Sequence, residues 1–312
     1  MSKNAYQAKI SWYRALYLVF AVIFIYVAIS QISSLKGSLE QLKSSNPIDD
    51  LLVAIAVGAT YCFAGLTYWL IAIKKLHYPR TLVMEFGINS LNRLLPAGIG
   101  AIGANYVYLT KSGHSRLQSA GVVAINNSLG VIGNSLVLGV LLITVRSNNL
   151  KISQTKIGLV GLIIIVLAVT SAMVYWLPNV RTKFNRGARH FFKQLMTYKD
   201  HKSKLVFGLA SSIGLTLSNV VALLFSLQAV NSHLALSSVM LAFSFAIWLG
   251  AVIPVPGGVG SVEAGLVGAL VAFNLALPQA VAAVLIFRLI SFWLPLILGM
   301  PALVWVRRRG YI

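Results

Sequence analysis

The sequence predicts an all-α polytopic membrane protein with about six full transmembrane helices and two re-entrant broken-helix hairpins arranged as an inverted repeat. Three observations predict this fold: an apolar composition, six apolar runs of membrane-spanning length, and two interrupted apolar stretches that share a motif. Of the 312 residues, 58% are hydrophobic and 10% are charged, whereas soluble domains are about 25% charged. We therefore treat residues 1–312 as a single integral membrane domain.

Six apolar runs are long enough to cross a bilayer, which takes about 20 residues. Basic residues precede the first run, as in a signal peptide, but the run is long and has no small-x-small cleavage site. We therefore expect it to be retained as the first helix. The six runs are 15–33, 51–73, 117–145, 157–178, 205–230 and 278–305.

Two further apolar stretches, 81–110 and 234–275, are interrupted by proline and glycine. At an offset of 160, the segment 96–104 aligns with 256–264. The proline, the final alanine and the pairs Gly98/Gly258 and Gly100/Gly260 are identical. This match predicts an internal duplication, with repeat-like halves of about 15–145 and 157–305.

The formal net charge of +20 comes from 26 Lys and Arg against 6 Asp and Glu. In a soluble protein this excess would indicate nucleic acid, but here the basic residues lie between the apolar runs, so we expect no nucleic-acid partner. Cytoplasmic loops accumulate Lys and Arg, and such clusters also bind anionic lipid headgroups. We predict a plasma (inner) membrane protein with both termini in the cytoplasm. The cytoplasmic segments are then 1–14, 74–80, the basic loop 179–204 and the Arg307–Arg309 tail.

The number of crossings between two cytoplasmic segments must be even. Runs 117–145 and 157–178 already supply two crossings, so stretch 81–110 must return to the cytoplasmic side from which it enters. The same count returns stretch 234–275 to the external side, although residues 234–253 are also long enough to span alone. Each half of the first stretch, about 15 residues or about 22 Å, is shorter than the ~30 Å hydrocarbon core. Matching hairpins that enter from opposite faces place the substrate site near the midplane.

Several kinds of chemistry are not expected. The pattern Gly98-x-Gly100-x-x-Gly103 matches a dinucleotide fingerprint only formally, because no strand precedes it. Cys62 is the only cysteine, which excludes an internal disulfide, and we expect it to be a small core residue. The five histidines never pair at helical spacing, so we expect no metal site and no cofactor. No serine–histidine–acid set is present, and we expect no enzymatic activity.

Four charged residues are predicted at membrane depth, where a charge costs several kcal/mol unless it is paired or hydrated: Glu85, Arg93, Glu263 and Arg288. Two interpretations remain open. The arginines can bind a lipid phosphate while Glu263 takes a cationic headgroup or a proton, or Glu263 and Arg288 can form a structural pair that holds the hairpin. For Glu85 we expect an interfacial charge at the cytoplasmic edge.

Neutral polar features accompany these charges. Glycine-rich breaks expose backbone N–H groups, and helix N-termini attract anions, so the breaks can cradle a phosphate or act only as hinges. Asn127 and Asn134 lie seven residues apart on one predicted span, and Ser212, Thr216 and Asn219 share a face of another. These stripes line a polar groove or form interhelical hydrogen bonds. The glycines of the breaks are Gly98, Gly100, Gly257, Gly258 and Gly260.

Two elements in the second half carry a family resemblance. They read Pro-x-Pro-Gly-Gly-x-Gly-x-x-Glu over 254–263 and Arg-x-x-x-Phe-Trp-x-Pro over 288–295, and a basic tail follows. Over residues 10–309 the chain resembles flippase-like proteins related to the transmembrane region of lysylphosphatidylglycerol synthase. The resemblance implies that Glu263 and Arg288 are characteristic positions and that an aminoacylated phospholipid is moved between leaflets.

The first half departs from this family. Members commonly carry Pro-Ala-Arg-x-Gly-Glu at the first hairpin, where this chain has Pro-Ala-Gly-Ile-Gly-Ala over 96–101. A later Arg-x-x-Asp of the family is replaced by the neutral surroundings of Asn127 and Ser128. Two charges that can recognise a headgroup are therefore missing. Only a short tail follows residue 305, so we expect that this chain does not synthesise the lipid itself.

We therefore predict a flippase-like membrane lipid translocase that moves an aminoacylated or other anionic-phosphate phospholipid between leaflets. One alternative is a carrier of polyprenyl-phosphate-linked sugars, which would use the same arginines. Another is a non-transporting membrane scaffold that docks partners through loop 179–204. The expected partners are a phospholipid or lipid-linked substrate, together with a second copy of the chain or a separate lipid-modifying enzyme.

Overall fold

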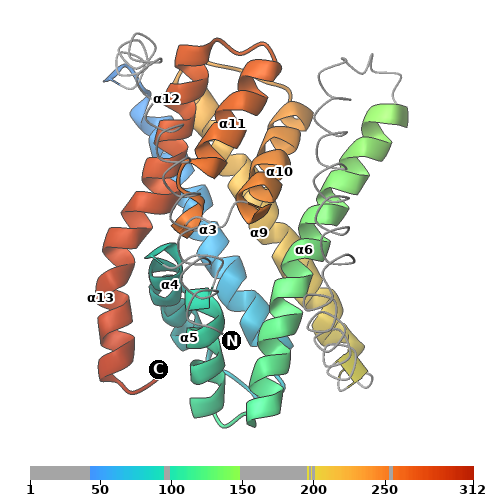
Figure 1. The fold of residues 1–312 in the computed structure, drawn as a ribbon, viewed down its shortest axis with the longest axis vertical. Coiled ribbons are helices and arrows are strands. Elements are labelled where there is room, and N and C mark those ends of the chain that lie inside the picture. The colour runs from blue at the N-terminus through green and yellow to red at the C-terminus, as the bar shows by residue number, and fades with distance from the viewer. Residues whose placement is uncertain (1–42, 95–98, 148–194, 197, 199–200, 253–255) are drawn as a thin grey trace, which may run out of the picture.

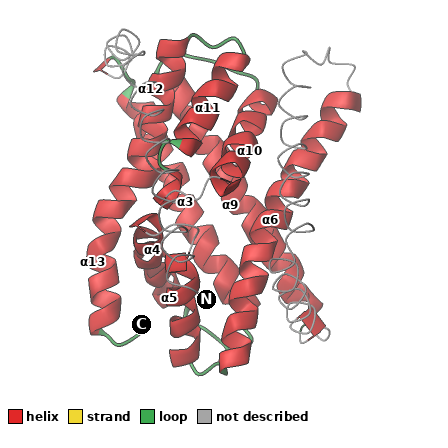
Figure 2. Ribbon diagram, in the orientation of Figure 1, coloured by secondary structure: helices red, strands yellow, loops and turns green. Residues whose placement is uncertain are grey.

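The computed structural model describes residues 43–94, 99–147, 195–196, 198, 201–252 and 256–312. All regular structure in these residues is helical, and no strand occurs among them (Figure 2). The predicted runs 15–33 and 157–178 lie outside the described residues. So does most of loop 179–204.

Four helices are long and apolar enough to cross a membrane. α3 has 25 residues, or about 38 Å at about 1.5 Å per residue, which exceeds the ~30 Å core. These helices confirm the four predicted runs that fall on described residues, and they make the chain a multi-pass membrane protein. They are α3 (Pro47–Ile71), α6 (Arg116–Ser147), α9 (Lys202–Ala229), and the continuous series α12 (Leu277–Arg288), η3 (Leu289–Trp293) and α13 (Leu294–Arg308).

Local sequence explains where two of these helices begin or change pitch. α3 starts at Pro47, and the side-chain oxygen of Asn46 accepts the Ile48 N–H at 3.1 Å, as expected of an N-cap. The last span contains the π-helical turn η3 just before Pro295. Proline has no N–H to donate to the carbonyl four residues earlier, so the Ser291 carbonyl lacks its usual α-helical donor.

Both interrupted stretches form pairs of short helices; the second break is described at η2, whereas residues 95–98 between the first two helices lie outside the described residues. The first gives α4 (Tyr78–Leu94) and α5 (Ile99–Lys111). The second gives α10 (Leu236–Val252), the short turn η2 (Pro256–Gly258) and α11 (Ser261–Ala272). In Figure 1 the α4–α5 pair lies in the lower half of the view and the α10–α11 pair lies in the upper half.

The two ends of the α4–α5 pair lie beside each other. The backbone N–H of Lys74, just before α4, donates to Nε2 of His114, just after α5, at 3.0 Å. The Lys74 ammonium group also donates to the Gly113 carbonyl. The chain therefore leaves this pair at the point where it entered.

The start of α9 and the C-terminus lie at the same end of the molecule. Lys204 Nζ donates to the Ala72 carbonyl at 2.6 Å, two residues before Lys74. The guanidinium of Arg80 lies 4.4 Å from the ring centroid of Tyr311. Basic residues from three separate parts of the sequence are thus gathered at one end.

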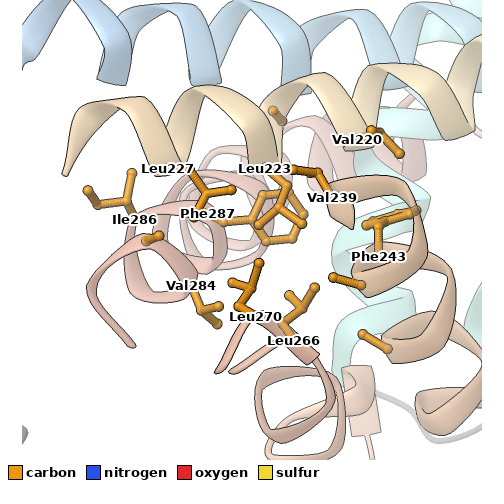
Figure 3. Packing of buried hydrophobic residues seen from close by; sticks show 14 of the residues in the cluster. Val220, Leu223, Leu227, Val239, Phe243, Leu266, Leu270, Val284, Ile286 and Phe287 are labelled. Carbon is orange, nitrogen blue, oxygen red and sulfur yellow. The ribbon is translucent and has the colours of Figure 1, made fainter. Parts of the chain in front are cut away.

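The upper half is built around a hydrophobic core that joins the second helix pair to the spans (Figure 3). Leu223 and Leu227 of α9 pack with Leu270 of α11. Phe243 of α10 meets Phe287 of α12 edge to face, with ring centroids 6.4 Å apart. This core positions α12 and the arginine at its end.

Backbone-to-backbone contact joins α4 to α13. A β-carbon on Gly87 would lie 2.9 Å from the backbone nitrogen of Leu303, and one on Gly299 would lie 2.8 Å from the carbonyl oxygen of Phe86. Small residues at helix contacts are typical of membrane proteins.

Cys62 is exposed on α3, so the prediction that it is a core residue was wrong: a small thiol is tolerated on the outer face of an apolar helix.

Candidate functional site

A cavity of about 610 Å³ lies between the two helix pairs and the spans, within the ~300–1,000 Å³ typical of small-molecule sites. Helices α3, α4, α5, α6, α9, α10, α11 and α12 contribute to its wall, as do η2 and η3. The polar and charged part of the wall, which decides what can bind, comes from Thr67, Tyr68, Glu85, Asn89, Asn92, Arg93, Asn105, Asn126, Asn127, Asn134, Ser212, Thr216, Asn219, Trp248, Arg288 and Ser291.

Helix α4 turns one polar face to the cavity. Glu85, Asn89, Asn92 and Arg93 all line it, and their spacing of four, three and one residues keeps them on one side of a helix. Eight residues separate Glu85 from Arg93, a rise of about 12 Å along the axis. The cavity therefore has an acidic position and a basic position at different depths along the same helix.

Arg288, at the end of α12, is 8% exposed and bonded on several sides. Its Nε donates to Glu263 Oε1 at 2.6 Å, and its Nη2 donates to the Gly257 carbonyl at 3.2 Å. The guanidinium lies 4.4 Å from the ring centroid of Phe292. The pair of Arg288 with Glu263 is the only ion pair among the described residues. The structural interpretation of Glu263 and Arg288 is thus realised in the geometry, while Arg288 also lines the cavity.

Arg93 has neutral partners only. Its Nη2 donates to the hydroxyl of Tyr61 at 2.7 Å and to the Ser291 carbonyl at 2.6 Å. Ser291 is the residue whose carbonyl loses its usual donor because of Pro295. The other terminal nitrogen, Nη1, is buried and has no hydrogen-bond partner among the described residues. The positive charge of Arg93 therefore faces the cavity with no carboxylate beside it in the part of the chain that the structure describes.

The second break reaches the end of α4. Gly257, Gly258 and Gly260 have φ of 60°, 66° and 85°, a region that favours glycine. A β-carbon on Gly257 would lie 3.0 Å from the Arg93 carbonyl oxygen. The Gly260 N–H donates to Glu263 Oε2 at 2.7 Å, so this predicted phosphate donor is occupied within the chain.

The glycines predicted to cradle a phosphate are thus divided by the structure. Gly257 lines the cavity. Gly100, Gly258 and Gly260 are described but do not form part of its wall, and Gly98 lies outside the described residues. Of the predicted glycines that the structure describes, only Gly257 can therefore contribute backbone groups to a phosphate site in the cavity.

The opposite end of the cavity is rich in amides. Glu85 is 4% exposed, and its carboxylate oxygen Oε2 lies 3.4 Å from Asn89 Nδ2. The expectation of an interfacial charge was wrong for Glu85, because α4 places it on the face that lines the cavity. Asn105 of α5 and Asn126 of α6 line the same cavity, and Asn105 is 2% exposed.

Both predicted polar stripes reach the cavity. Asn127 and Asn134 line it from α6, and Ser212, Thr216 and Asn219 line it from α9. Of the two interpretations offered by the sequence, the polar groove is the one that the structure forms.

Unsatisfied polar atoms are concentrated in this cavity. Buried polar groups in folded proteins are nearly always hydrogen-bonded, yet seven buried side-chain atoms of the described residues have no partner. Five of the seven belong to residues of the cavity wall. They are the acceptors Glu85 Oε1, Asn105 Oδ1 and Asn134 Oδ1, and the donors Arg93 Nη1 and Trp248 Nε1.

A profile of the family described as "Lysylphosphatidylglycerol synthase TM region" matches residues 14–299. The chain belongs to this family. The resemblance predicted from the two motifs of the second half is thereby confirmed. Among curated proteins, none matches the chain. Membership of the lysylphosphatidylglycerol synthase TM region family makes this a membrane protein with a lipid-related role.

For this lysylphosphatidylglycerol synthase TM region protein, the sequence identified the arginines and missed most of the amide-rich wall. Glu85, Asn89 and Asn92 follow the helical period, and this spacing in an apolar stretch was a signal that could have been used. Asn126 directly precedes the predicted Asn127, but Asn105 is isolated in the sequence and shares a wall with Asn126 only when α5 and α6 pack. Trp248 carries no polar pattern around it, so nothing in the sequence pointed to its buried N–H.

Proposed function

We propose that this protein is a lipid translocase that carries the phosphate-bearing headgroup of a lipid across the bilayer through the cavity, without changing the lipid chemically. The observation that supports it most is the guanidinium of Arg93, which is partly buried, has no carboxylate partner among the described residues and faces a cavity. A buried charge at membrane depth costs several kcal/mol unless something compensates it. A phosphate is the lipid group that does so best, because arginine binds phosphate through paired charge-assisted hydrogen bonds.

Two arginines make this end of the cavity suitable for one anion. Arg93 and Arg288 lie 5.5 Å and 4.4 Å from the ring centroid of the same residue, Phe292. Glu263 neutralises one of the two charges. The remaining charge matches a phosphodiester, which carries a single negative charge.

The re-entrant arrangement of both helix pairs is part of this proposal. α4 and α10 have 17 residues each, about 26 Å, which is shorter than the ~30 Å core. The hydrogen bond from Lys74 to His114 supports a first pair that enters and leaves on one side. The basic residues gathered there support a cytoplasmic assignment for that side, with both termini in the cytoplasm of an inner-membrane protein.

The position of the cavity supports alternating access. Gly257 of the second break approaches Arg93 at the end of α4, so the two breaks meet at the arginine end of the cavity. In transporters built from inverted repeats, the substrate site lies where the broken helices meet, and the two halves rock around it. A non-transporting scaffold has no need of a cavity with uncompensated polar groups, so the scaffold alternative is less well supported.

Reconstitution tests the proposal. The purified full-length protein is placed in liposomes containing fluorescent phosphatidylglycerol, and the fraction of label accessible to an external quencher is followed in time. We expect the wild type to equilibrate the label between leaflets, and we expect Arg93→Gln to slow it by about tenfold or more, because one charge-assisted hydrogen bond is worth about 1.5–3 kcal/mol.

The matched control is Arg80→Gln, which removes an arginine from the same helix but outside the cavity. It should leave the rate unchanged. The proposal would be overturned, and the scaffold favoured, by a wild-type rate no greater than that of protein-free liposomes. This result would have to hold for phosphatidylglycerol and also for phosphatidylinositol, phosphatidylethanolamine, lysylphosphatidylglycerol and polyprenyl-phosphate glucose.

A further inference from the structure

The cavity wall carries many neutral amides and few charges. Seven asparagines line it, against one carboxylate, that of Glu85. An amide offers both hydrogen-bond donors and an acceptor but no net charge. Such a wall suits a ligand that is polar, neutral and rich in groups that donate and accept. The seven are Asn89, Asn92, Asn105, Asn126, Asn127, Asn134 and Asn219.

We infer that the headgroup bound in this cavity is polyhydroxylic: a sugar or another polyol joined to the lipid through the phosphate. The inference rests on the proposed function and narrows it from any phosphate-bearing lipid to this class. The phosphate lies at Arg93 and Arg288, and the hydroxyl groups extend along α4 towards Glu85.

The unpartnered atoms of the wall favour hydroxyls over an ammonium group. Within the part of the chain that the structure describes, three buried acceptors have no partner, on Glu85, Asn105 and Asn134, and the donor Trp248 Nε1 has none either. An ammonium group has donors only, so it would satisfy the acceptors and leave the indole N–H without a partner. Hydroxyls donate and accept, so a polyol can satisfy all four positions.

The placement of these atoms also fits an extended headgroup. Glu85 lies about 12 Å from Arg93 along α4, while Asn134 and Trp248 reach the cavity from α6 and α10. The free polar atoms therefore surround the ligand on several sides and continue beyond the reach of an ethanolamine group. Trp248 and Phe243 also give the wall aromatic faces on which the apolar C–H face of a sugar ring can pack.

Binding is tested first with soluble headgroups, because this result does not depend on transport. The probes are glucose 1-phosphate, O-phosphoethanolamine and inorganic phosphate, and the readout is the thermal unfolding midpoint of the purified protein in detergent. We expect glucose 1-phosphate to raise the midpoint more than the other two. A midpoint raised equally by all three, or most by phosphoethanolamine, would overturn the inference and leave the arginine site intact.

Asn105→Leu and Asn134→Leu then locate the effect. Both replacements keep a side chain of similar length and remove the amide, so the extra stabilisation by glucose 1-phosphate should be lost while the response to inorganic phosphate remains. The matched control is Ser135→Leu, at the next position of α6, which is exposed and outside the cavity. It should behave as wild type, and loss of the extra response there would contradict the assignment.

A transport assay shows which kind of polyol lipid the protein moves. It also separates a failure of the polyol inference from a failure of the translocase proposal. Liposomes carry polyprenyl-phosphate glucose, phosphatidylinositol, lysylphosphatidylglycerol or phosphatidylethanolamine. We expect one or both polyol lipids to move at least about tenfold faster than phosphatidylethanolamine, the factor that about 1.4 kcal/mol corresponds to. Preferential movement of lysylphosphatidylglycerol would overturn the polyol inference while supporting the translocase. No movement of any lipid would overturn the translocase itself.

Discussion

The two broken helix pairs of this protein each lie beside an arginine, and the two arginines differ in their partners. At the second break, Arg288 is paired with Glu263, and the same carboxylate accepts the Gly260 N–H. At the first break, Arg93 has only a phenol hydroxyl and a carbonyl as partners. The charge of the second break is thus neutralised within the chain, whereas the charge of the first has no carboxylate beside it among the described residues, as the proposed phosphate site requires.

One aligned position accounts for the difference between the two breaks. At the offset of 160 that aligns the two breaks, the residue matching Glu263 is Gly103. A β-carbon there would meet no other described part of the chain within 4 Å, so no packing contact with the described residues demands glycine. The first break therefore lacks a carboxylate at the position where the second break has one.

Glu263→Gln should have the largest effect on stability. It keeps the shape and an acceptor for Gly260, but it leaves Arg288, whose side chain is 10% exposed, without a counter-charge. Removing one member of a buried pair costs about 3–5 kcal/mol, and we expect the lower part of this range because Glu263 is 27% exposed. The measurement is equilibrium unfolding in mixed detergent micelles.

The double variant Glu263→Gln with Arg288→Met is the control for this prediction. Because a buried pair can be replaced by apolar side chains at little cost, the double variant should recover much of the stability lost in the single one. A single variant as stable as wild type would mean that the second break is not stabilised by its charges.

Gly299→Ala tests how the first break is held by the second half of the chain. Its β-carbon would lie 2.8 Å from the Phe86 carbonyl oxygen, so α4 and α13 must separate. Overpacking of this kind costs about 1–3 kcal/mol. Gly139→Ala on α6 is the matched control, because its β-carbon meets nothing within 4 Å among the described residues, and it should be neutral or stabilising by up to about 1 kcal/mol. Equal effects on the thermal midpoint would show that the α4–α13 contact is loose.

Ser90→Ala removes a smaller contribution from the same contact. Ser90 Oγ donates to the Pro295 carbonyl at 2.9 Å, and a neutral buried hydrogen bond contributes about 1 kcal/mol. We expect a loss of about that size in the free energy of unfolding, with α4 less firmly held beside η3. Ser218→Ala is the comparison, since among the described residues the Ser218 hydroxyl donates to the Gly214 carbonyl of its own helix and to no other helix. A loss no greater than that of Ser218→Ala would argue against this role.

Length and composition predicted the spans and breaks on the described residues, because a bilayer imposes a length of about 20 apolar residues and tolerates glycine and proline chiefly at breaks. The same constraint identified Arg93, Glu263 and Arg288, since each charge in an apolar stretch needs a reason. These features depend on local sequence alone.

The rest depended on distant contacts. The bond from Arg93 to the Ser291 carbonyl joins residues 198 positions apart, and no local pattern reports it. Glu85 was misplaced because a crossing count gives the side on which a hairpin begins but not the depth or direction of each side chain. Asn105 and Asn126 needed the packing of α5 against α6 before they shared a wall.

The smallest expected effect concerns the ends of the first helix pair, where the stability should depend on pH through His114. His114 is 3% exposed. Its Nδ1 lies 3.1 Å from the Leu109 carbonyl and its Nε2 accepts the Lys74 N–H, an arrangement that requires the neutral ring. Burial lowers the pKa of His114, and the charges of Lys74 and Lys204 add to this effect.

The folded state therefore binds this proton less readily than the unfolded chain, whose histidine pKa is about 6.5. The contribution of His114 is fully present above that pH, and it is lost as the pH falls towards the lowered pKa of the folded state. We expect the thermal midpoint to fall between pH 7.5 and pH 5.5, and we expect a smaller fall in His114→Gln, whose amide oxygen can accept the Lys74 N–H without titrating. An identical fall in the two proteins would show that the junction of α4 and α5 does not depend on the neutral imidazole. The first pair would then be held by its other contacts, among them the packing of α4 against α13.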